Sequence, residues 1–546
     1  MPEQAQKHET SVKETLTSIM ISFIVALVFR GFVIEGFQIP TGSMGPTLLG
    51  AHVDVHSDLS GYSWPLESWR HYPGTATPMP NQDNINPTDP ITGIELPASN
   101  YKRRSGDRVF VFKYLEPIFI PRRWDVTVFK VPTATSENYI KRTIGMPGEQ
   151  LAIVDGDIFT RPVEATPAGW STPGWQIQRK PERIQRAVWQ TVFDSTFAPA
   201  GSMSYRSPWK ADSASWRGLD AGPSYTYDDT APTMLTWLNN AQRLDDYLPF
   251  NEIPNSAGQD WNRIRGLDVY PVSDIAISFG FEPDTDAATV SAILGTRSHE
   301  FRATLVRDGT HTTAVIDFRA IIAGDSAWHQ IDVAQVKDNA LAAGRVTDIE
   351  FWHADQAIWL FADGKLIAGG PENGAYNWDI AERVEYTMGE DLALALDEDT
   401  RGRIRLTSPT LYPVPALRVA FGGSPFKLHR VRVQRDLFYR PALYRATKWP
   451  GDPSTSPGRP ALATHPASPL MLGPDDFFMC GDNSARSLDG RLWGATHPTI
   501  LDRYETGPGK VHRNLLIGKA FVVYFPAIRK RYGIPVLDFG NMRWIW

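Results

Sequence analysis

Residues 41–48 read Thr41-Gly42-Ser43-Met44-Gly45-Pro46-Thr47-Leu48 and come directly after a long apolar run. Further along the chain, residues 139–149 read Tyr139-Ile140-Lys141-Arg142-Thr143-Ile144-Gly145-Met146-Pro147-Gly148-Glu149. A serine hydroxyl is a poor nucleophile until a base removes its proton, and a lysine can be that base only if its pKa is depressed from about 10.4. Ser43 and Lys141 are therefore candidates for a serine–lysine pair, a catalytic arrangement that needs no histidine.

The apolar run extends from residue 15 to residue 37 and contains two charged residues near its end, Arg30 and Glu35. A helix of about 20 residues is long enough to cross a bilayer, and an arginine near its end can extend its charge to the headgroups. A cleavable signal peptide has a similar composition. We favour a membrane anchor over residues 15–37, because the candidate nucleophile Ser43 follows the run at once.

Several later stretches complete an ordered pattern. They are Ser105-Gly106-Asp107-Arg108-Val109-Phe110-Val111-Phe112-Lys113, Arg123-Trp124-Asp125-Val126-Thr127-Val128-Phe129-Lys130, Asp155-Gly156-Asp157-Ile158, Met479-Cys480-Gly481-Asp482-Asn483-Ser484-Ala485-Arg486-Ser487-Leu488-Asp489-Gly490-Arg491-Leu492-Trp493-Gly494 and residues 514–526. Together with the serine and lysine stretches, and in this order, they resemble the sequence boxes of type I signal peptidases. These are membrane-bound serine proteases that remove signal peptides from exported proteins.

The resemblance assigns roles to individual residues. It makes Ser43 the nucleophile and Lys141 the general base, with further residues of the last stretch supporting the site. These supporting residues are Asp482, Asn483, Ser487, Asp489 and Arg491. Ser487 would hydrogen-bond the lysine amine, and Asp489 would form an ion pair with Arg491. The alternative for these last three residues is a polar turn.

The tetrahedral intermediate of such a reaction needs hydrogen-bond donors already in place for its oxyanion. The candidates are the main-chain N–H of Ser43 and the hydroxyl of Thr41, which stands where the family often has serine. Thr41 could instead be an ordinary turn-forming hydroxyl. Other departures from the family pattern are Ser484, Ala485 and Arg486 in place of Arg-Asp-Asn, Gly490 in place of serine, and Trp124 in place of a glycine. Every residue proposed for chemistry is retained, so we expect an active enzyme.

The resemblance also implies a substrate and a location. The substrates would be exported preproteins with signal peptides, cut after small residues at sites of the Ala-x-Ala type. The protein would pass once through the inner (cytoplasmic) membrane, with residues 1–14 in the cytoplasm and the catalytic part on the extracytoplasmic side. Its partners would be the lipid bilayer, the preproteins and, as a further possibility, the protein export machinery. No cofactor is expected.

Composition excludes several other classes of protein. The chain has 55 Lys and Arg against 61 Asp and Glu, and this net charge of -6 gives no basic excess for binding nucleic acid. Its single cysteine, Cys480, excludes an internal disulfide framework and a cysteine-based zinc ribbon. The scattered histidines His52, His56 and His71 are weak evidence for a metal, since no paired-ligand spacing accompanies them. We predict no metal site.

Two segments interrupt the family pattern. Residues 50–104 are rich in Pro, Asn, Asp and aromatic residues and predict an irregular excursion at the rim of the active site. Residues 200–440 contain short alternating runs, for example 275–281 and 313–318, which predict a β-sandwich. We read residues 348–367 as two strands with a turn at Asp363-Gly364.

The hairpin around Asp363-Gly364-Lys365 and the strand at residues 426–433 resemble concanavalin-like or laminin-G-like jelly rolls. Such domains often bind glycans, but aromatic residues on strands are more often core than ligand-stacking. We therefore favour a structural or docking role for this insert over glycan binding, since a fold alone does not establish a ligand.

The predicted fold is mostly β: a transmembrane helix, then a signal-peptidase-type β core interrupted by a jelly-roll-like sandwich. The expected division is 1–14 N-terminus, 15–37 anchor, 38–160 first part of the core with its insert 50–104, 161–199 connector, 200–440 sandwich, 441–470 Pro-rich linker and 471–546 second part of the core. Two other classes stay open. Soluble self-cleaving repressors share the serine–lysine chemistry, although the anchor argues against them, and a tethered binding protein could use the same scaffold without catalysis.

Overall fold

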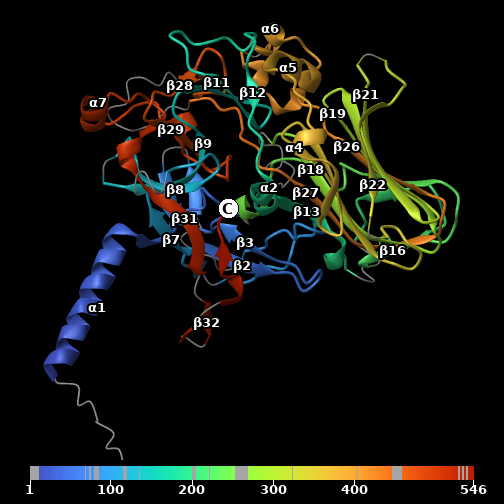
Figure 1. Cartoon of the computed structure of the whole chain (residues 1–546), viewed down its shortest axis with the longest axis horizontal. Helices are drawn as coiled ribbons and strands as arrows, with labels where there is room; N and C mark the ends of the chain where they lie inside the picture. The colour runs from blue at the N-terminus through green and yellow to red at the C-terminus, as the bar shows by residue number, and fades with distance from the viewer. Residues whose placement is uncertain are drawn as a thin grey trace, which may run out of the picture.

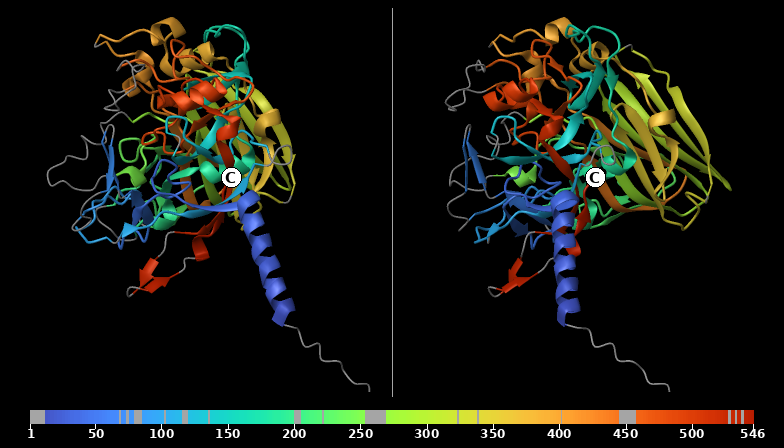
Figure 2. Two further views of the ribbon diagram at one scale, coloured as in Figure 1. Left: turned by 90° about the vertical axis from the view of Figure 1, so that its left-hand side faces the viewer. Right: turned by 60° about the vertical axis from the view of Figure 1, so that its left-hand side comes forward.

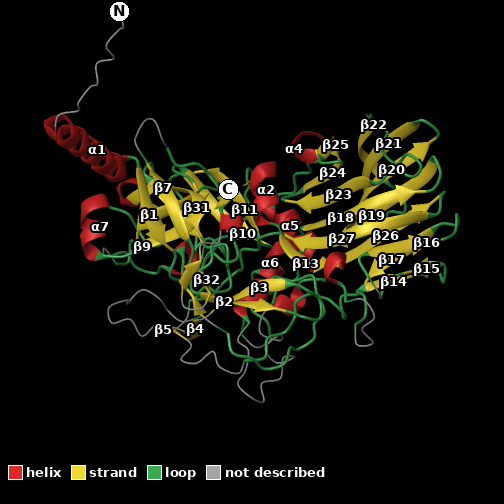
Figure 3. Cartoon of the chain, turned by 90° about the horizontal axis from the view of Figure 1, so that it is seen from below, coloured by secondary structure: helices red, strands yellow, loops and turns green. Residues whose placement is uncertain are grey.

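Strands dominate the secondary structure, which confirms the predicted mostly β fold (Figure 1). The computed structural model describes residues 12–67, 69–72, 75–78, 85–101, 103–114, 120–134, 136–199, 205–220, 222–252, 269–322, 324–337, 339–400, 402–444, 458–526, 529–531, 534–536 and 539–546. Seen from below, the strands of a large sandwich lie on one side of the molecule, and a sheet containing β1, β7 and β31 lies on the other (Figure 3).

The helix α1 (Val12–Phe32) projects away from the rest of the protein (Figure 2). Its apolar side chains, such as Met20 and Phe23, are exposed. It is long and apolar enough to cross a membrane, so it fits the predicted anchor over most of its length. The predicted span is too long at its end, because residues 34–38 form the strand β1 (Ile34–Gln38).

The sheet that contains β1 is built from strands of the first and last parts of the chain. Its order is β1-β7-β31-β8-β9-β29-β30, with β34 beside β31. The bounds are β7 (Arg108–Lys113), β8 (Val126–Lys130), β9 (Asn138–Gly145), β29 (Asp476–Cys480), β30 (Lys510–His512), β31 (Leu516–Phe525) and β34 (Arg543–Trp544). Antiparallel pairing of β9 with β29 places Arg142 opposite Cys480, so the predicted lysine stretch lies beside the start of the last predicted stretch.

A smaller sheet packs near this one, in the order β12-β11-β10-β28. Its strands are β10 (Glu149–Val154), β11 (Asp157–Pro162), β12 (Gln176–Ile177) and β28 (Leu470–Met471). The hairpin of β10 and β11 turns at Asp155-Gly156, whose φ angles of 47° and 85° are those of a two-residue turn that favours glycine. Apolar side chains from β10, β11 and β29 share one buried cluster, which joins the two sheets.

Residues 50–104 are more regular than predicted. Three short strands, β2 (His52–His56), β3 (Ser63–Glu67) and β6 (Arg103–Arg104), form a sheet, and β4 (Trp69–Tyr72) pairs with β5 (Thr75–Pro78). Val53, Val55, Trp64 and Leu66 bury a small apolar core, because the burial alternates along β2 and β3. The composition concealed this pattern, since its apolar residues are few and separated by turn residues.

Two large antiparallel sheets face each other in the sandwich. The first has the order β15-β16-β27-β18-β23-β24-β25, with β13 also beside β27, and the second has the order β14-β17-β26-β19-β20-β21-β22. The strands are β13 (Gln190–Asp194), β14 (Trp209–Ala211), β15 (Trp216–Arg217), β16 (Ser224–Tyr227), β17 (Thr233–Trp237), β18 (Ile275–Pro283), β19 (Ala287–Thr296), β20 (His299–Asp308), β21 (His311–Ala320), β22 (His329–Val336), β23 (Thr347–Ala354), β24 (Ala357–Ala362), β25 (Lys365–Gly369), β26 (Ala416–Gly422) and β27 (Phe426–Arg435).

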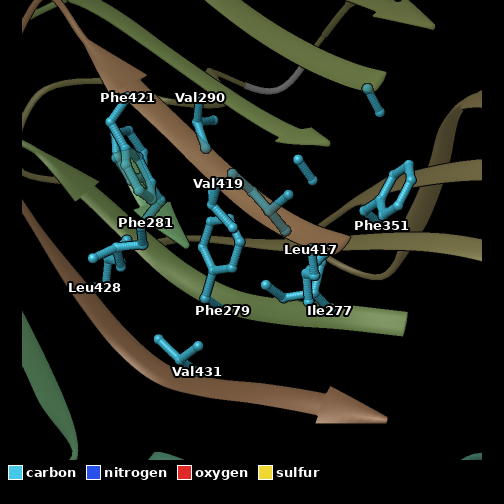
Figure 4. Packing of buried hydrophobic residues seen from close by; sticks show 14 of the residues in the cluster. Ile277, Phe279, Phe281, Val290, Phe351, Leu417, Val419, Phe421, Leu428 and Val431 are labelled. Atoms are coloured by element: carbon cyan, nitrogen blue, oxygen red, sulfur yellow. The ribbon is translucent and has the colours of Figure 1, made fainter. Parts of the chain in front are cut away.

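The core of the sandwich comes from alternate residues of these strands. Phe279 and Phe281 of β18 lie in one buried cluster with Val419 and Phe421 of β26, and Figure 4 shows these side chains gathered in the interior. Residues 348–367 form three strands rather than the two predicted, because a second turn occurs at Asp355-Gln356, where both φ angles are positive. The sheet also begins at Gln190, inside the segment predicted as a connector.

Among the described residues, the helices other than α1 are short. They are α2 (Glu182–Val188), α4 (Gly370–Asn373), α5 (Ile380–Met388), α6 (Leu392–Ala395) and α7 (Pro498–Tyr504). The 3-10 turn η2 (Pro249–Asn251) follows β17 in the chain and packs against β3. Through this contact the sandwich segment reaches the sheet of residues 50–104, beside the serine stretch.

Candidate active site

The candidate nucleophile lies on a tight turn after β1. The Gly45 N–H donates to Gly42 O over 2.9 Å, and Ser43 lies between them, partly buried. A Cβ atom at Gly42 would be 2.4 Å from Glu67 Oε1, and one at Gly45 would be 2.7 Å from the ring of Phe250. Only glycine fits at these two positions, which explains why the serine is flanked by Gly42 and so closely followed by Gly45.

Lys141 approaches this turn from β9. Its Nζ donates to Ser43 Oγ over 2.6 Å and to Ile140 O over 3.1 Å, and the lysine is only 3% exposed. Burial lowers the pKa of Lys141 to about 8, although Asp489, Cys480 and Asp482 each act in the opposite direction. Desolvation dominates because it penalises the charged ammonium more than the carboxylates stabilise it. The geometry thus brings together the two residues that the sequence singled out.

The predicted pair of Asp489 and Arg491 is buried beside the lysine. Arg491 donates from Nε and Nη2 to the two oxygens of Asp489, over 2.9 and 2.8 Å. The Gly481 N–H also donates to Asp489 Oδ2, over 3.0 Å. Burial raises the pKa of Asp489, but the Arg491 charge outweighs it and holds that pKa below its ordinary value. The pair therefore fixes the loop that follows β29.

Asp482 makes a second bidentate pair, with Arg142. Arg142 Nε and Nη2 donate to Asp482 over 2.8 and 2.6 Å, and the Thr47 hydroxyl donates to the same carboxylate over 2.6 Å. Arg142 Nη1 donates to the main-chain oxygens of Trp124 and Trp546. Asp482 thus joins the serine turn, through Thr47, to the strand that carries Lys141.

Ser487 lies in the same region without the predicted contact to Lys141. Its hydroxyl is buried and faces the Asp489 carboxylate, where it helps to hold the pKa of Asp489 below its ordinary value. A Cβ atom at Gly481 would be 2.3 Å from this hydroxyl oxygen and 2.4 Å from Ser43 O, so Ser487 does pack next to the serine turn. An orienting role for Ser487 stays a prediction.

Asn483 holds the serine turn from the other side. Its side-chain Nδ2 donates to Gly42 O over 2.9 Å, and its main-chain N–H donates to Ser43 O over 3.1 Å. The Gly42 N–H in turn donates to Glu67 Oε1 over 3.1 Å. Within the described ranges, neither the Ser43 N–H nor the Thr41 hydroxyl has a hydrogen-bond partner, so both candidate oxyanion donors are available.

Comparison with known proteins agrees with this arrangement. Residues 94–167, which include Lys141, match the family described as signal peptidase, peptidase S26. This part of the chain is therefore similar to the peptidase S26 family. Among curated proteins, Signal peptidase I of Rickettsia typhi is 28% identical over 165 residues, which is 30% of this chain and 49% of that protein. Signal peptidase I of Buchnera aphidicola (subsp. Baizongia pistaciae) is 31% identical over 156 residues, 29% of this chain and 36% of that protein.

The chain therefore spans about half, or less, of the length of these curated relatives. The S26 match ends at residue 167, before the sandwich begins. Among solved structures, a carbohydrate-binding module of Bacillus subtilis aligns with this chain at 6% identity and a TM-score of 0.22. The alignment covers 42% of this chain and 96% of the module. A score this low carries no argument about the sandwich, and its predicted docking role stays a prediction.

Two departures of the chain from the signal peptidase sequence pattern have a structural reason. Trp124 has a φ of 74°, the left-handed region where glycine is preferred, which accounts for the glycine usual at this position. Ser484 Oγ accepts from Arg491 Nη1 over 2.8 Å and from the Arg440 N–H over 2.9 Å. The substituted serine thus supports the Asp489–Arg491 pair instead of disturbing it.

Functional contacts that the sequence did not reveal come from the two inserts. Glu67 belongs to residues 50–104, and Phe250 and Asn251 precede the sandwich strands β18–β27. No local motif marks these residues, because their partners lie far away in the sequence. Glu67 contacts Gly42, Phe250 packs against Gly42 and Gly45, and Asn251 bonds Asn483. Only the fold reveals these contacts.

A cluster of buried carboxylates lies apart from Ser43 and Lys141, between β11 and the sandwich. Oxygens of Asp157, Asp274 and Asp355 lie within 4.8 Å of one another, as the ligands of a metal would. Protein cations already lie among them: Arg297 donates to Asp274 over 2.7 Å, and Lys180 pairs with Asp355. The charges are thus compensated by side chains. Of the three histidines, His52 contacts Gly50 O and Asp54, His56 contacts Ser63, and the side chain of His71 is outside the described residues.

Proposed function

We propose that this protein is a type I signal peptidase that uses Ser43 as its nucleophile and Lys141 as its general base. The contact of 2.6 Å between Lys141 Nζ and Ser43 Oγ is the observation that carries the proposal. The relatives named Signal peptidase I support the same reading. The lowered pKa of Lys141, about 8, makes a neutral amine accessible near physiological pH, as a general base requires.

The proposed reaction has two stages. Ser43 Oγ attacks the scissile carbonyl carbon while Lys141 takes the serine proton, and the oxyanion forms facing the Ser43 N–H and the Thr41 hydroxyl. Collapse breaks the C–N bond, and Lys141 returns the proton to the leaving amine. Water then attacks the acyl ester with Lys141 as its base, which releases the signal peptide and restores Ser43.

The supporting residues act through these two groups. Asp489 and Arg491 hold the loop after β29, and Asp482 with Arg142 fixes β9 next to Lys141. Ser487, in this proposal, helps to orient the lysine amine once substrate is bound. Neither a metal nor a cofactor has a step in this mechanism.

The substrates, in this proposal, are exported preproteins cut after small residues at Ala-x-Ala sites. Helix α1 has the length to cross the inner membrane once, and the S26 domain would lie on its extracytoplasmic side, where signal peptides emerge. The bilayer and the export machinery are then its partners, and the sandwich serves as a structural or docking element.

The test is cleavage of a synthetic preprotein with an Ala-x-Ala site by the full chain in detergent. Wild type should cut at that site, and Ser43→Ala and Lys141→Ala should each lose the activity. Lys210→Ala removes an exposed lysine of the sandwich and should leave cleavage unchanged. An inactive wild type, or an active Ser43→Ala variant, would contradict the proposal and favour the tethered binding protein.

A further inference from the structure

A side chain from the segment between the sandwich strands β17 and β18 reaches the serine turn through one intermediary. Asn251 lies at the end of η2, and its Nδ2 donates to Asn483 Oδ1 over 2.8 Å. In return, Asn483 Nδ2 donates to Asn251 Oδ1 over 2.7 Å. The two amides thus form a reciprocal pair, and the second hydrogen of Asn483 Nδ2 is left for Gly42 O at 2.9 Å.

Gly42 O accepts from Asn483 Nδ2 and from the Gly45 N–H, and these two bonds together fix the direction of a candidate oxyanion donor. The Gly42 carbonyl and the Ser43 N–H belong to one planar peptide unit, so fixing the carbonyl also fixes the direction of the N–H. A peptide that is free to rotate would have to be reoriented in the transition state, at a cost in rate. A donor held in place beforehand avoids that cost.

Asn251 determines which end of the Asn483 amide faces Gly42. A side-chain amide turned by 180° would present its oxygen to the Gly42 carbonyl, and two acceptors would then face each other. In that flipped orientation Asn483 would also lose its matched contacts with both Asn251 atoms. The reciprocal pair therefore favours the one orientation in which Asn483 donates to Gly42 O.

The segment that carries Asn251 is itself fixed in place. Phe250 is buried against the serine turn, where its ring leaves no room for a Cβ at Gly42 or Gly45. On the other side of Asn251, the Glu252 carboxylate is buried and accepts from the Thr88 N–H over 2.9 Å. Asn251 is thus held between two anchored neighbours, as a residue that must orient another side chain requires.

We propose that Asn251 is a positioning residue that, through Asn483, aims the Ser43 N–H at the oxyanion of the reaction. The inference rests on the proposed signal peptidase function. It gives the segment before β18 a part in the S26 site that the family's own sequence boxes do not contain. Asn251 touches neither the substrate nor the reacting atoms in this scheme, and it acts only through Asn483 and the Gly42–Ser43 peptide.

The first test compares steady-state cleavage by Asn251→Ala with that of a matched control, Gln242→Ala. Gln242 is also a side-chain amide that joins separate segments, since its Nε2 donates to Pro90 O and Val192 O, but it does not contact the serine turn. Loss of orientation should lower kcat about tenfold, less than the hundredfold or more of deleting an oxyanion donor, and leave KM within about twofold. Gln242→Ala should match wild type in both constants.

The second test separates orientation from general damage. A substrate-like peptide aldehyde adds Ser43 Oγ to its carbonyl carbon, and the resulting hemiacetal oxygen takes the oxyanion position, whereas the corresponding peptide alcohol binds without this bond. Asn251→Ala should weaken binding of the aldehyde by the same factor by which it lowers kcat/KM, and it should leave binding of the alcohol unchanged. Asn251→Asp, which has the shape of asparagine but cannot donate to Asn483 Oδ1, should resemble Asn251→Ala.

Equal weakening of aldehyde and alcohol, or Asn251 variants that match Gln242→Ala, would overturn the inference. A variant that fails to fold is recognised by its thermal unfolding, and Asn251→Asp then decides the outcome. These results are distinct from failure of the proposed function, because in that case either the wild-type protein would not cleave the preprotein or Ser43→Ala would stay active.

Discussion

Arg142 and Asp482 form an ion pair in which both side chains are fully buried, with 2.6 Å between Nη2 and Oδ2. The two residues are neighbours of the site: Arg142 follows Lys141 on β9, and Asp482 follows the end of β29 by two positions. The Asp482 charge raises the pKa of Arg142 further, despite the opposing effect of burial. The pair therefore holds β9, the strand that carries Lys141, to the loop that carries Asn483.

Breaking the Arg142–Asp482 pair should strongly destabilise the protein. Asp482→Asn leaves the Arg142 charge buried without its partner, and removing one member of such a pair costs about 3–5 kcal/mol. We expect a large fall in the thermal unfolding midpoint of the detergent-solubilised protein. The control is Asp348→Asn, since the Asp348–Arg430 pair has a similar distance of 2.7 Å but is 58% exposed on both sides. Exposed pairs contribute about 0–1 kcal/mol, so equal effects of the two changes would contradict the prediction.

Activity should rise with pH through the pKa of Lys141. Only the neutral amine can accept the Ser43 proton, and burial lowers this pKa to about 8. Below that pH the lysine is protonated, so kcat/KM should fall about tenfold for each unit of pH, whereas above about pH 9 it should level off. The measurement is kcat/KM from about pH 6 to about pH 10, a range that brackets this pKa.

A lysine-specific control accompanies this profile. Lys141→Arg keeps the positive charge, but a guanidinium is not deprotonated in proteins, so this variant should be inactive over the whole range. A flat wild-type profile, or one that rises toward acid, would show that the titrating group is not a base of this kind.

Gly481 should be intolerant of any side chain. A Cβ atom there would lie 2.3 Å from Ser487 Oγ and 2.4 Å from Ser43 O, so Gly481→Ala must displace the serine turn. A shift of about 1 Å at a reacting group can cost about a hundredfold in rate, and we expect a loss of kcat of that order. Gly507→Ala is the matched control, because nothing lies within 4 Å of its Cβ position. Normal cleavage by Gly481→Ala would mean that the turn can yield without consequence.

The catalytic candidates could be predicted from the sequence because their signals are local. Ser43 and Lys141 each lie in a short recognisable string. Glu67 contacts the serine turn directly and Asn251 acts on it through Asn483, and both come from segments outside these strings. No spacing rule connects Asn251 to Asn483, since only the folded inserts bring them together. Their roles therefore required the three-dimensional arrangement.

The fold shows the same division between local and long-range information. The Asp363-Gly364 turn was readable, but the turn at Asp355-Gln356 was missed, because neither residue is a glycine although both have positive φ. The helix α5 was missed as well, although Asp379 and Glu382 form a capping box at its start. That signal was present in the sequence, and the alternating runs around it concealed it.

Trp124 offers a test of backbone strain, because glycine should be a more stable replacement than alanine at this position, the reverse of the usual order. Its φ of 74° costs a residue with a Cβ about 1–2 kcal/mol, while its buried indole ring packs in the cluster that joins the sheet of β9 and β29 to the sheet of β10 and β11. Truncation of a buried tryptophan costs about 3–5 kcal/mol, so both Trp124→Ala and Trp124→Gly should be less stable than wild type. Alanine retains the strain and glycine does not. Glycine should therefore be the more stable of the two by about 0.5–1 kcal/mol, after allowance for its greater freedom when unfolded.

The comparison needs only the thermal unfolding midpoints of the three proteins under one set of conditions. Val188 lies in the same apolar cluster, within the helix α2, and Val188→Ala against Val188→Gly gives the ordinary order, in which glycine is worse than alanine by about 1 kcal/mol. If Trp124→Gly were also less stable than Trp124→Ala, the positive φ would carry no cost, and the usual glycine at this position would need another explanation. The reversed order would show that this chain retains the tryptophan because the burial of its ring outweighs the strain of its backbone.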